Sequence, residues 1–325
     1  MMIVTGANGF IGSAIVWELN HHGHQDIVCV DSVGLEKRPE ALARRSFASF
    51  LLKDELWDFL AANTAGPQKP QWIIHMGACS STTEKNVEFL RENNTLYTQR
   101  LFTWCTEHHV PFIYASSGAT YGNGDQGFDD HIDPQELTAL NPYGESKLAF
   151  DRWVVQQQKA PPQWYGLRFF NVYGPGEDHK DEMASVVYKA FQQIQETGRL
   201  QLFRSHRPDY ADGQQLRDFI YVKDITSWIW QIMHMDVRSG IYNMGFGQAR
   251  TWLDLSTAVF KNMGREVNIE WIDMPESIRN QYQYKTRAVI DKLMEQGLPK
   301  PEWSLELGIA DYVVNYLSKH TSTYL

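Results

Sequence analysis

Residues 2–12 of the chain read MIVTGANGFIG, a short apolar run followed by glycines in the spacing GxxGxxG. The glycines are Gly6, Gly9 and Gly12, and the residues that follow predict an amphipathic helix from Phe10 to about residue 20. Glycine permits a tight turn, a close approach of the backbone to a pyrophosphate, and close packing of helix on strand. The helix start presents backbone N–H groups and a partial positive charge to phosphate oxygens. The stretch therefore predicts the dinucleotide-binding turn of a parallel α/β sheet.

Asp31 supports this interpretation from the end of the next apolar run, residues 26–31. It lies about 20 residues beyond the glycines, where a carboxylate can bind the hydroxyl groups of a cofactor ribose. A glycine motif taken alone is weak evidence, and the structural alternative is an ordinary glycine-rich loop. The strand before the motif, the helix after it and Asp31 together favour the cofactor interpretation.

Apolar runs of strand length alternate with helical patterns through the first half of the chain. The runs are residues 72–76, 112–116 and 165–170, and the helical patterns span residues 84–107 and 142–158. This alternation predicts a doubly wound parallel sheet, the Rossmann arrangement, with helices on both faces. We expect this domain over residues 1–170, and a smaller α/β substrate-binding domain, partly interleaved with it, over residues 171–325. In the second half we expect strands at 219–222 and 241–244, helices near 182–197, 251–263 and 304–317, and an exposed loop over 204–217.

Composition excludes several classes of protein. The formal net charge of −9 argues against a general nucleic-acid binder, which needs a basic face. No run of ~18 apolar residues and no secretory leader occur, so we expect a cytoplasmic protein without a membrane partner. The three widely spaced cysteines form no disulfide framework, and the histidines of the run His21-His22-Gly23-His24 have no partner at ligand spacing. We therefore expect no metal site.

Tyr143 and Lys147 form a YxxxK pair just after Asn141-Pro142, where a helix is expected to begin. Positions i and i+4 share one helix face, so the ammonium should lie beside the phenol. A nearby positive charge favours the phenolate, which lowers a phenol pKa that starts near ~10. The pair therefore predicts a tyrosine that shuttles a proton at neutral pH. A solvated surface pair is the structural alternative.

These two motifs resemble the extended branch of the short-chain dehydrogenase/reductase family. The segment YASSGATYG, residues 114–122, is similar to the serine-containing segment of that branch. The resemblance places the serine that hydrogen-bonds the reacting oxygen at Ser117, with Ser116 as the alternative. A 4,6-dehydratase of the same branch has an acidic pair directly after this serine, where this chain has Gly118-Ala119.

Four further segments resemble the ADP-L-glycero-D-manno-heptose 6-epimerase family: ACSSTTE (78–84), FFNVYGP (169–175), HKDEMASV (179–186) and RDFIYVKD (217–224). The resemblance extends from residue 1 to about residue 317. It implies conversion of ADP-D-glycero-β-D-manno-heptose to the L-glycero epimer, in the synthesis of the lipopolysaccharide core. A hydride would leave carbon 6, a transient 6-ketone would form, and the hydride would return to the opposite face. The resemblance further implies ADP-heptose as substrate and a homo-oligomer.

The resemblance also implies roles for individual residues. Tyr143 would be one acid/base, assisted by Lys147 and Ser117, and Lys180 would be the second. The residues implied for cofactor binding are Gly6, Gly9, Phe10, Ile11, Gly12, Asp31, Ser32, Arg38, Lys53, Met76, Gly77, Ala78, Cys79, Ser80, Asn93, Tyr143, Lys147 and Val172. The residues implied for substrate binding are Ser117, Asn171, Lys180, Glu182, Lys189, Phe203, Arg204, Arg217 and Tyr282. Arg217 suits a diphosphate because its guanidinium is a planar fork of donors.

The choice of cofactor depends on two opposing features. Asp31 by itself favours NAD, because a carboxylate repels the 2′-phosphate of NADP. Lys37 and Arg38 offset that repulsion, and the resemblance places a 2′-phosphate contact at Arg38. We therefore expect NADP, with NAD as the alternative.

The chain departs from the family at a few positions. Glu182 stands where some members have a small polar residue, Lys189 stands near a position that is His in others, and the loop over residues 204–215 is longer than in some members. Two other functions stay open. One is a UDP- or dTDP-hexose 4-epimerase of the same family, against which the segment 179–186 argues. The other is a non-catalytic NADP-sensing protein, a class that typically lacks the Tyr or the Lys that this chain keeps.

Overall fold

The computed structural model describes residues 1–279, 282–319 and 325, apart from the side chains of residues 67, 181, 182, 277 and 278. By its internal contacts the chain divides into two compact units. Unit 1 comprises Met1–Phe169, Thr226–Asn243 and Asp291–Leu298, and unit 2 comprises Phe170–Ile225, Met244–Ile290 and Pro299–Leu325. The two domains expected from the sequence, residues 1–170 and 171–325, stay a prediction.

Unit 1 is built on a seven-stranded sheet in the order β10-β6-β5-β4-β1-β2-β3. Its strands are β1 (Met2–Thr5), β2 (Ile27–Asp31), β3 (Ser49–Leu52), β4 (Trp72–His75), β5 (Phe112–Ser117), β6 (Trp164–Phe169) and β10 (Gly240–Met244). The six neighbours from β6 to β3 are paired in parallel. The order reverses between β1 and β4, and ligands of such sheets bind at that reversal, beyond the carboxyl ends of the strands. The predicted doubly wound parallel sheet is confirmed.

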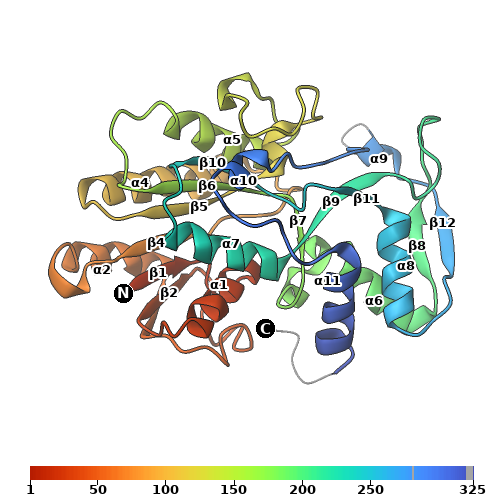
Figure 1. Ribbon diagram of the computed structural model, residues 1–325, viewed down its shortest axis with the longest axis horizontal. Coiled ribbons are helices and arrows are strands. Elements are labelled where there is room, and N and C mark those ends of the chain that lie inside the picture. Colours follow the sequence, from red (N-terminus) through yellow and green to blue (C-terminus); the bar gives the residue numbers. More distant parts are fainter. Residues whose placement is uncertain (280–281, 320–324) are drawn as a thin grey trace. The chain divides into compact units, whose positions relative to one another are not determined.

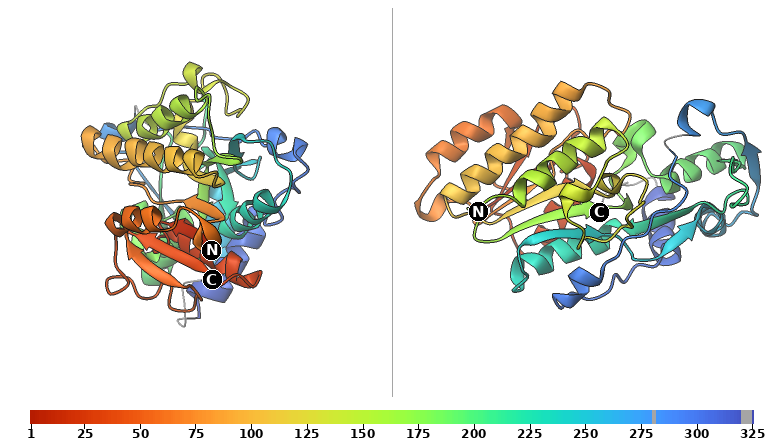
Figure 2. Two further views of the ribbon diagram at one scale, coloured as in Figure 1. Left: turned by 90° about the vertical axis from the view of Figure 1, so that its left-hand side faces the viewer. Right: turned by 90° about the horizontal axis from the view of Figure 1, so that it is seen from above.

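Helices cover both faces of this sheet (Figures 1 and 2). The longer ones are α1 (Phe10–His21), α2 (Leu56–Ala62), α4 (Tyr97–Glu107), α5 (Pro142–Val154) and α7 (Val222–His234). On one face α1 meets α7, where the Thr226 hydroxyl donates to Glu18 Oε2 at 2.9 Å. On the other face α2, α4 and α5 pack together, with the ring of Phe102 5.5 Å from that of Trp153. Shorter helical segments are η1 (Lys53–Glu55), η2 (Gly66–Gln68), α3 (Val87–Leu90), η3 (Arg91–Leu96), η4 (Gly118–Tyr121), η5 (Pro134–Glu136) and α10 (Asp291–Glu295).

The start of α5 is set by local sequence. Asn141 is its N-cap, with its side-chain oxygen accepting from Gly144 N at 2.8 Å, and Pro142 occupies the first turn. Such a cap stabilises a helix by about 1 kcal/mol, and proline has no N–H to leave unsatisfied there. On its inner face Phe150 packs edge-on against Tyr114 of β5, with ring centroids 4.6 Å apart. These contacts hold Tyr143 and Lys147 in the first two turns of a buried helix.

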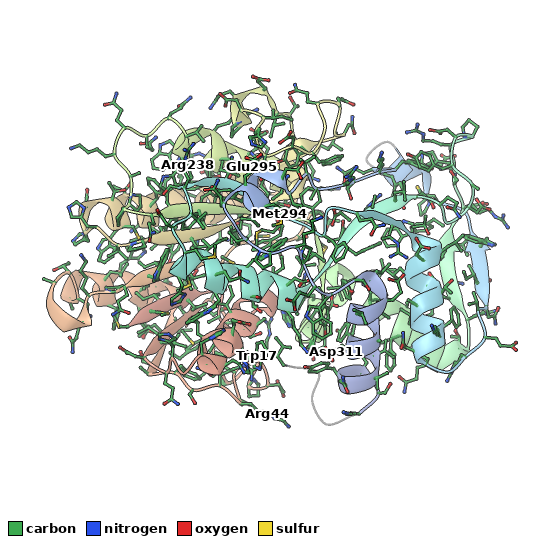
Figure 3. All side chains as sticks on the ribbon, viewed as in Figure 1. Trp17, Arg44, Arg238, Met294, Glu295 and Asp311 are labelled. Atoms are coloured by element: carbon green, nitrogen blue, oxygen red, sulfur yellow. The ribbon has the colours of Figure 1, made fainter. Side chains whose placement is uncertain are left out.

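Unit 2 has a three-stranded sheet, β11-β9-β7, and a two-stranded sheet, β12-β8. The strands are β7 (Asn171–Tyr173), β8 (Leu200–Phe203), β9 (Leu216–Tyr221), β11 (Ala249–Thr251) and β12 (Ile269–Ile272). The helices are η6 (Asp178–Met183), α6 (Val186–Thr197), α8 (Trp252–Asn262), α9 (Glu276–Arg279), α11 (Leu305–Asp311) and the π-helical η7 (Tyr312–Leu317). Apolar side chains of α6, α8 and α11 share one core with β8 and β9. Asp311, labelled in Figure 3, ties α11 to the end of β9 by accepting from the Tyr221 hydroxyl at 2.7 Å.

Most elements expected from the sequence are present, and three differences have a physical cause. The strand β3 and the helix α7 were not predicted, because β3 is short and only partly buried and α7 follows β9 without a break. The helical pattern over 84–107 contains a π-helical segment, η3, between α3 and α4. The loop over 204–217 is shorter than predicted, because Leu216 already begins β9. Among the described residues, every helix is too short or too polar to cross a bilayer.

Candidate active site

The glycine turn is a cradle of bare backbone between β1 and α1. Gly6 has a φ of +67°, and a Cβ there would lie 2.7 Å from the backbone N of Gly77. A Cβ on Gly12 would lie 2.0 Å from the carbonyl oxygen of Gly6. Gly9 is the N-cap of α1 and supplies no side-chain acceptor to the first turn. The turn therefore has the close approach of backbone that a pyrophosphate needs, so this chain fits a dinucleotide cofactor.

Asp31 lies at the end of β2 and is fastened to this turn. Its Oδ2 accepts from the backbone N of Asn8 at 3.0 Å, and its Oδ1 accepts from Val33 N at 3.1 Å. The guanidinium of Arg38 donates to the carbonyl of Asn8 at 2.6 Å. The structure thus brings Asp31 and Arg38 together at the glycine turn, while Ser32 is exposed beside them. The ribose role of Asp31 and the 2′-phosphate role of Arg38 stay predictions.

The segment from Met76 to Ser80 follows β4, the neighbour of β1. Gly77 N donates to the Thr5 hydroxyl at 3.1 Å, and Cys79 N donates to Asn94 Oδ1 at 2.8 Å. The Asn94 amide donates back to the Cys79 carbonyl at 3.0 Å, which gives this segment a defined shape. Ala78 lies between these two anchored residues.

Lys53 and Asn93, both predicted to contact cofactor, lie together. The Lys53 ammonium donates to Asn93 Oδ1 and lies 4.5 Å from the centre of the Tyr97 ring. Burial lowers the pKa of Lys53, with Arg100 adding to the effect and Asp54 opposing it. Asn94, the next residue, was not predicted and is only 1% exposed. The sequence shows Asn93 and Asn94 side by side, but it does not show that Asn94 bonds the backbone of Cys79.

Tyr143, Lys147 and Ser117, the residues predicted to be catalytic in unit 1, lie near the end of β5. The side chains of Tyr143 and Lys147 are 9% and 6% exposed, and the Lys147 ammonium donates to the carbonyl of Ala115 at 3.0 Å. Burial lowers the pKa of Lys147 to about 8, while Asp151 opposes the shift. Ser117 ends β5 and caps η4, with its hydroxyl accepting from Ala119 N at 3.1 Å.

The predicted lowering of the Tyr143 pKa by Lys147 is wrong for the groups that the chain itself supplies. Burial raises the pKa of Tyr143, and only a hydrogen bond with the Ser117 side chain opposes this. The cause is that the Lys147 ammonium points to the Ala115 carbonyl, while the phenol is removed from water. An ionised Tyr143 would therefore depend on further positive charge, such as the nicotinamide ring expected in this site.

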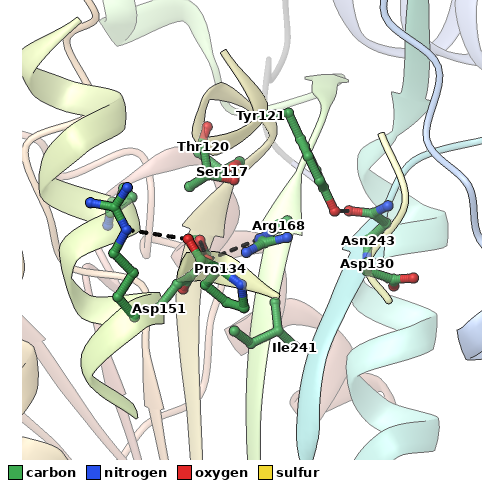
Figure 4. Close-up of polar contacts among 12 residues, drawn as sticks. Ser117, Thr120, Tyr121, Asp130, Pro134, Asp151, Arg168, Ile241 and Asn243 are labelled. Carbon is green, nitrogen blue, oxygen red and sulfur yellow. Dashed lines mark hydrogen bonds and ion pairs between the residues drawn. The ribbon is translucent and has the colours of Figure 1, made fainter. Parts of the chain in front are cut away.

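A buried network of hydrogen bonds around Asp151 contacts residues of β5. Asp151, one helical turn after Lys147, accepts from the hydroxyls of Tyr114 and Ser116 and from Arg168 Nε, each at 2.9 Å. Figure 4 shows the dashed contact between Asp151 and Arg168, and the Tyr121 hydroxyl reaching toward Asn243. The hydroxyl of Ser116, the alternative to Ser117, is therefore already hydrogen-bonded to Asp151. Ser117, by contrast, forms a hydrogen bond with Tyr143, and its predicted role stays a prediction.

Lys180 lies on η6 in unit 2, and its neighbour Glu177 is fully buried. Burial lowers the pKa of Lys180, and Glu177 opposes the shift. A lowered pKa makes a lysine a better proton carrier at physiological pH than an ordinary surface lysine. The side chain of Glu182 lies outside the described residues, so its predicted substrate contact stays a prediction.

Arg217, predicted to bind the diphosphate, has a buried guanidinium in unit 2. Its side chain is 8% exposed, and its guanidinium lies 5.0 Å from the ring centre of Tyr282 and 5.7 Å from that of Trp252. Its Nη1 donates to its neighbour's carbonyl, that of Leu216, at 2.9 Å. Among the described residues no carboxylate forms an ion pair with it. A buried guanidinium without a counter-charge is suited to a phosphate oxygen.

The remaining predicted substrate residues are spread over unit 2. Asn171 lies on β7 next to Val172, which was predicted for cofactor binding, Phe203 ends β8, and Lys189 is half-buried on α6. Arg204 is exposed and pairs with Asp212 at 3.0 Å. Arg217 and Tyr282 therefore lie in contact, whereas Arg204 forms an ion pair with Asp212. The roles of these residues stay predictions.

One trio among the described residues could offer three ligand atoms to a metal ion. The trio is Asp129, Asp130 and His131, whose ligand atoms lie within 4.8 Å of one another. The ammonium of Lys292 donates to the carbonyl of Asp130 at 3.0 Å, and a positive charge there opposes a cation. The sequence had drawn attention instead to the run at residues 21–24, where His22 pairs with Glu18 at 3.1 Å.

Comparisons with known proteins show the family to which the chain belongs. The model of the NAD dependent epimerase/dehydratase family matches residues 2–245. An ADP-L-glycero-D-manno-heptose-6-epimerase of Fusobacterium nucleatum is 45% identical over 99% of both chains, and one of Nitratidesulfovibrio vulgaris (strain DP4) is 46% identical over 98% of both. The crystal structure of the Helicobacter pylori ADP-L-glycero-D-manno-heptose-6-epimerase, 25% identical, superposes with a TM-score of 0.77 over 97% of this chain and 95% of that one.

A UDP-glucose 4-epimerase from Thermus thermophilus, solved as a complex with NAD, is also 25% identical and has a TM-score of 0.76. It covers 95% of this chain and 96% of its own. The fold is thus shared across epimerases of different sugars, and the identity over the whole chain discriminates among them. The chain belongs to the NAD dependent epimerase/dehydratase family and, within it, to the ADP-L-glycero-D-manno-heptose-6-epimerases.

Proposed function

We propose that the chain inverts carbon 6 of ADP-D-glycero-β-D-manno-heptose, with Tyr143 and Lys180 as its two acid/base residues and NADP as its cofactor. The observation that carries this proposal is the group of buried Tyr143 and Lys147 with half-buried Ser117, in the same unit as the glycine cradle and in a chain 45% identical to an enzyme of that name. The residues at the glycine turn would hold the cofactor, and the acid/base residues would move protons.

NADP is favoured by the presence of Arg38 as well as Asp31 at Asn8 of the glycine turn. The carboxylate already accepts two backbone N–H groups, and the guanidinium lies at the carbonyl of Asn8. The two hydrogen bonds that the Asp31 carboxylate accepts weaken its repulsion of a 2′-phosphate, and the Arg38 guanidinium attracts that phosphate. When bound, such a cofactor supplies the hydride acceptor and donor for carbon 6. Titration calorimetry should show tighter binding of NADP than of NAD, and Arg38→Ala should remove most of the difference.

Tyr143 would move the proton of the reacting oxygen. Oxidation at carbon 6 requires the hydroxyl proton to leave as the hydride leaves, and reduction of the ketone requires a proton to return. The phenol can do both, while the Ser117 hydroxyl donates to the oxygen as its charge changes. Lys147 is fixed by the Ala115 carbonyl and supplies positive charge on the same helix face.

Lys180 would serve the other orientation of the sugar. Inversion presents opposite faces of carbon 6 in turn, so a proton carrier compatible with each is needed. The lowered pKa of Lys180 suits exchange in both directions. Arg217 would hold the diphosphate, with Tyr282 beside it and Phe203, Asn171 and Lys189 as further contacts.

The test is proton NMR of the purified protein with ADP-D-glycero-β-D-manno-heptose and added NADP. The L-glycero epimer should form with the wild type, while Tyr143→Phe and Lys180→Ala should each slow its formation by at least about 100-fold. Circular dichroism controls for folding. Formation of the epimer at an unchanged rate by either variant would remove that residue from the acid/base role.

A 4-epimerase acting on a UDP-hexose is the second candidate, because the fold is shared with the Thermus thermophilus enzyme. Turnover of UDP-glucose and not of the ADP-heptose would favour it. Binding of NADP without turnover of either sugar would favour the non-catalytic alternative. A cytoplasmic location and a homo-oligomer belong to the same proposal, and light scattering in solution tests the second.

A further inference from the structure

Glu177 is a buried carboxylate that joins the two ends of the segment bearing Lys180. Its side chain is 0% exposed. Its Oε1 accepts from the backbone N of Gly174 at 3.2 Å and from the Ser185 hydroxyl at 2.6 Å, and its Oε2 accepts from Ser185 N. Gly174 directly follows β7, and Ser185 is the N-cap of α6. One side chain thus closes residues 174–185 into a loop.

Lys180 lies within this loop and is bonded to Glu177 through the main chain. Its backbone N donates to the carbonyl of Glu177 at 3.0 Å, which forms one turn of η6. The carboxylate and the ammonium also interact through space, since each shifts the proton affinity of the other. Removing a carboxylate from water is costly, so a buried one with three donors is retained only where its bonds or its charge are needed.

We propose that Glu177 is a positioning residue for Lys180: it closes the loop of residues 174–185 and supplies the negative charge that keeps the Lys180 ammonium available as an acid. This inference rests on the proposed function, in which Lys180 is the second acid/base. Tyr143 and Lys147 have no part in it.

Among the side chains of this loop that the structure describes, Glu177 raises the Lys180 pKa, against the effect of burial. Tyr312 of η7 faces both Glu177 and the neighbouring Asp178, and burial keeps its phenol neutral by raising its pKa. Replacing Glu177 by Gln would remove the charge that favours the ammonium. The Lys180 pKa should therefore fall, so less of the acid form should be present at neutral pH.

The first experiment measures Lys180 itself, without substrate. The full-length protein is acetylated with trace acetic anhydride between pH 6 and 11, and modification of Lys180 is read by mass spectrometry. In Glu177→Gln the midpoint for Lys180 should move down by about one pH unit. Asp178→Asn removes an equal charge one residue away and should leave the midpoint in place. A shift in Glu177→Gln no larger than in Asp178→Asn would overturn the proposal.

Two further variants separate charge from loop closure. Glu177→Asp keeps the charge and should restore the wild-type midpoint. Ser185→Ala keeps the charge and removes one donor, so kcat should fall several-fold with little change of KM, while the midpoint stays. If Glu177→Gln fails to fold, an unchanged kcat in Ser185→Ala overturns the positioning role. A shift of the labelling midpoint without a shift of the pH–rate profile would instead show that Lys180 is not the second acid/base.

Discussion

The side-chain amide of Asn94 donates a 3.0 Å hydrogen bond to the hydroxyl of Ser146, which lies three residues after Tyr143. The same amide bonds both backbone groups of Cys79, and Ser146 in turn donates to the Tyr143 carbonyl at 2.7 Å. One buried residue therefore joins the predicted cofactor loop to the helix that carries the reactive tyrosine. It does so from η3, and π-helical segments occur frequently at functional sites.

Asn94→Ala should weaken cofactor binding by about tenfold or more. Its loss leaves the Cys79 N–H without its partner and removes one of the two hydrogen bonds of the Ser146 hydroxyl, at a cost of about 1–3 kcal/mol in unfolding free energy. Thermal unfolding and fluorescence titration with NADPH measure the two effects. The neighbouring Asn93→Ala should weaken binding without a comparable loss of stability. Equal stability losses in both variants would contradict the joining role of Asn94.

Ser117→Ala should slow the reaction and move its pH dependence. The hydrogen bond from Ser117 lowers the pKa of Tyr143, so its removal raises that pKa further. The limb of the kcat/KM profile that reports Tyr143 should then shift to higher pH, and kcat at pH 7 should fall by about 100-fold.

Ser116→Ala is the matched control for that variant. Ser116 is 2% exposed and bonded to Asp151, so its removal should cost about 1 kcal/mol of stability and leave the pH limb in place. A shift of the limb in Ser116→Ala, and none in Ser117→Ala, would exchange the roles of the two serines.

The ion pair of Asp151 with Arg168 should behave as a coupled unit. Both side chains are at most 1% exposed, with Arg168 Nε 2.9 Å from Asp151 Oδ2. Removing one partner leaves a buried charge, so Asp151→Asn or Arg168→Met alone should cost about 3–5 kcal/mol of unfolding free energy. The double variant should cost clearly less than the sum of the two, as measured by urea denaturation. An additive double variant would contradict the coupling.

His75 should make the protein sensitive to acid below pH 6.5. Burial, assisted by the charges of Lys147 and Lys53, lowers its pKa to about 3. The unfolded chain binds a proton at about pH 6.5 and the folded chain does not, so the contribution of His75 is complete above pH 6.5. Below that pH it is lost at about 1.4 kcal/mol per pH unit, down to about pH 3.

His75→Gln removes the contribution of the His75 titration, because the glutamine amide can still bond Thr5 and Thr98, the two partners of the imidazole. The wild type must be compared with this variant because two buried carboxyl groups change the stability in the opposite direction as the pH falls. Burial raises the pKa of Asp218 and of Asp224 to about 6, and their cost is relieved as the pH falls from 6 toward 4. Between pH 6.5 and 5 the wild type should lose more unfolding free energy than His75→Gln. Equal losses would mean that His75 is not held neutral.

Local spacing predicted the parts of the site that lie close together in the chain. The glycines of residues 6–12 and the Tyr143–Lys147 pair follow from the geometry of one turn and one helix. Asn94 was missed because its partner Ser146 is 52 positions away and is reached only by tertiary folding. Glu177 was missed although its partners Gly174 and Ser185 are close in the chain, because nothing in the sequence marks this glutamate as buried. The pKa of Tyr143 was mispredicted for the same reason, since its burial depends on packing that no spacing reveals.

The most direct test of the central claim is the fate of the hydrogen on carbon 6. Purified protein is incubated with ADP-D-glycero-β-D-manno-heptose in D₂O without added cofactor, and the product is analysed by proton NMR. Transient oxidation with return of the same hydride predicts the L-glycero epimer with protium retained at carbon 6. Deuterium at carbon 6 would contradict the hydride route, and the absence of any epimer even after NADP and NAD are added would contradict the substrate.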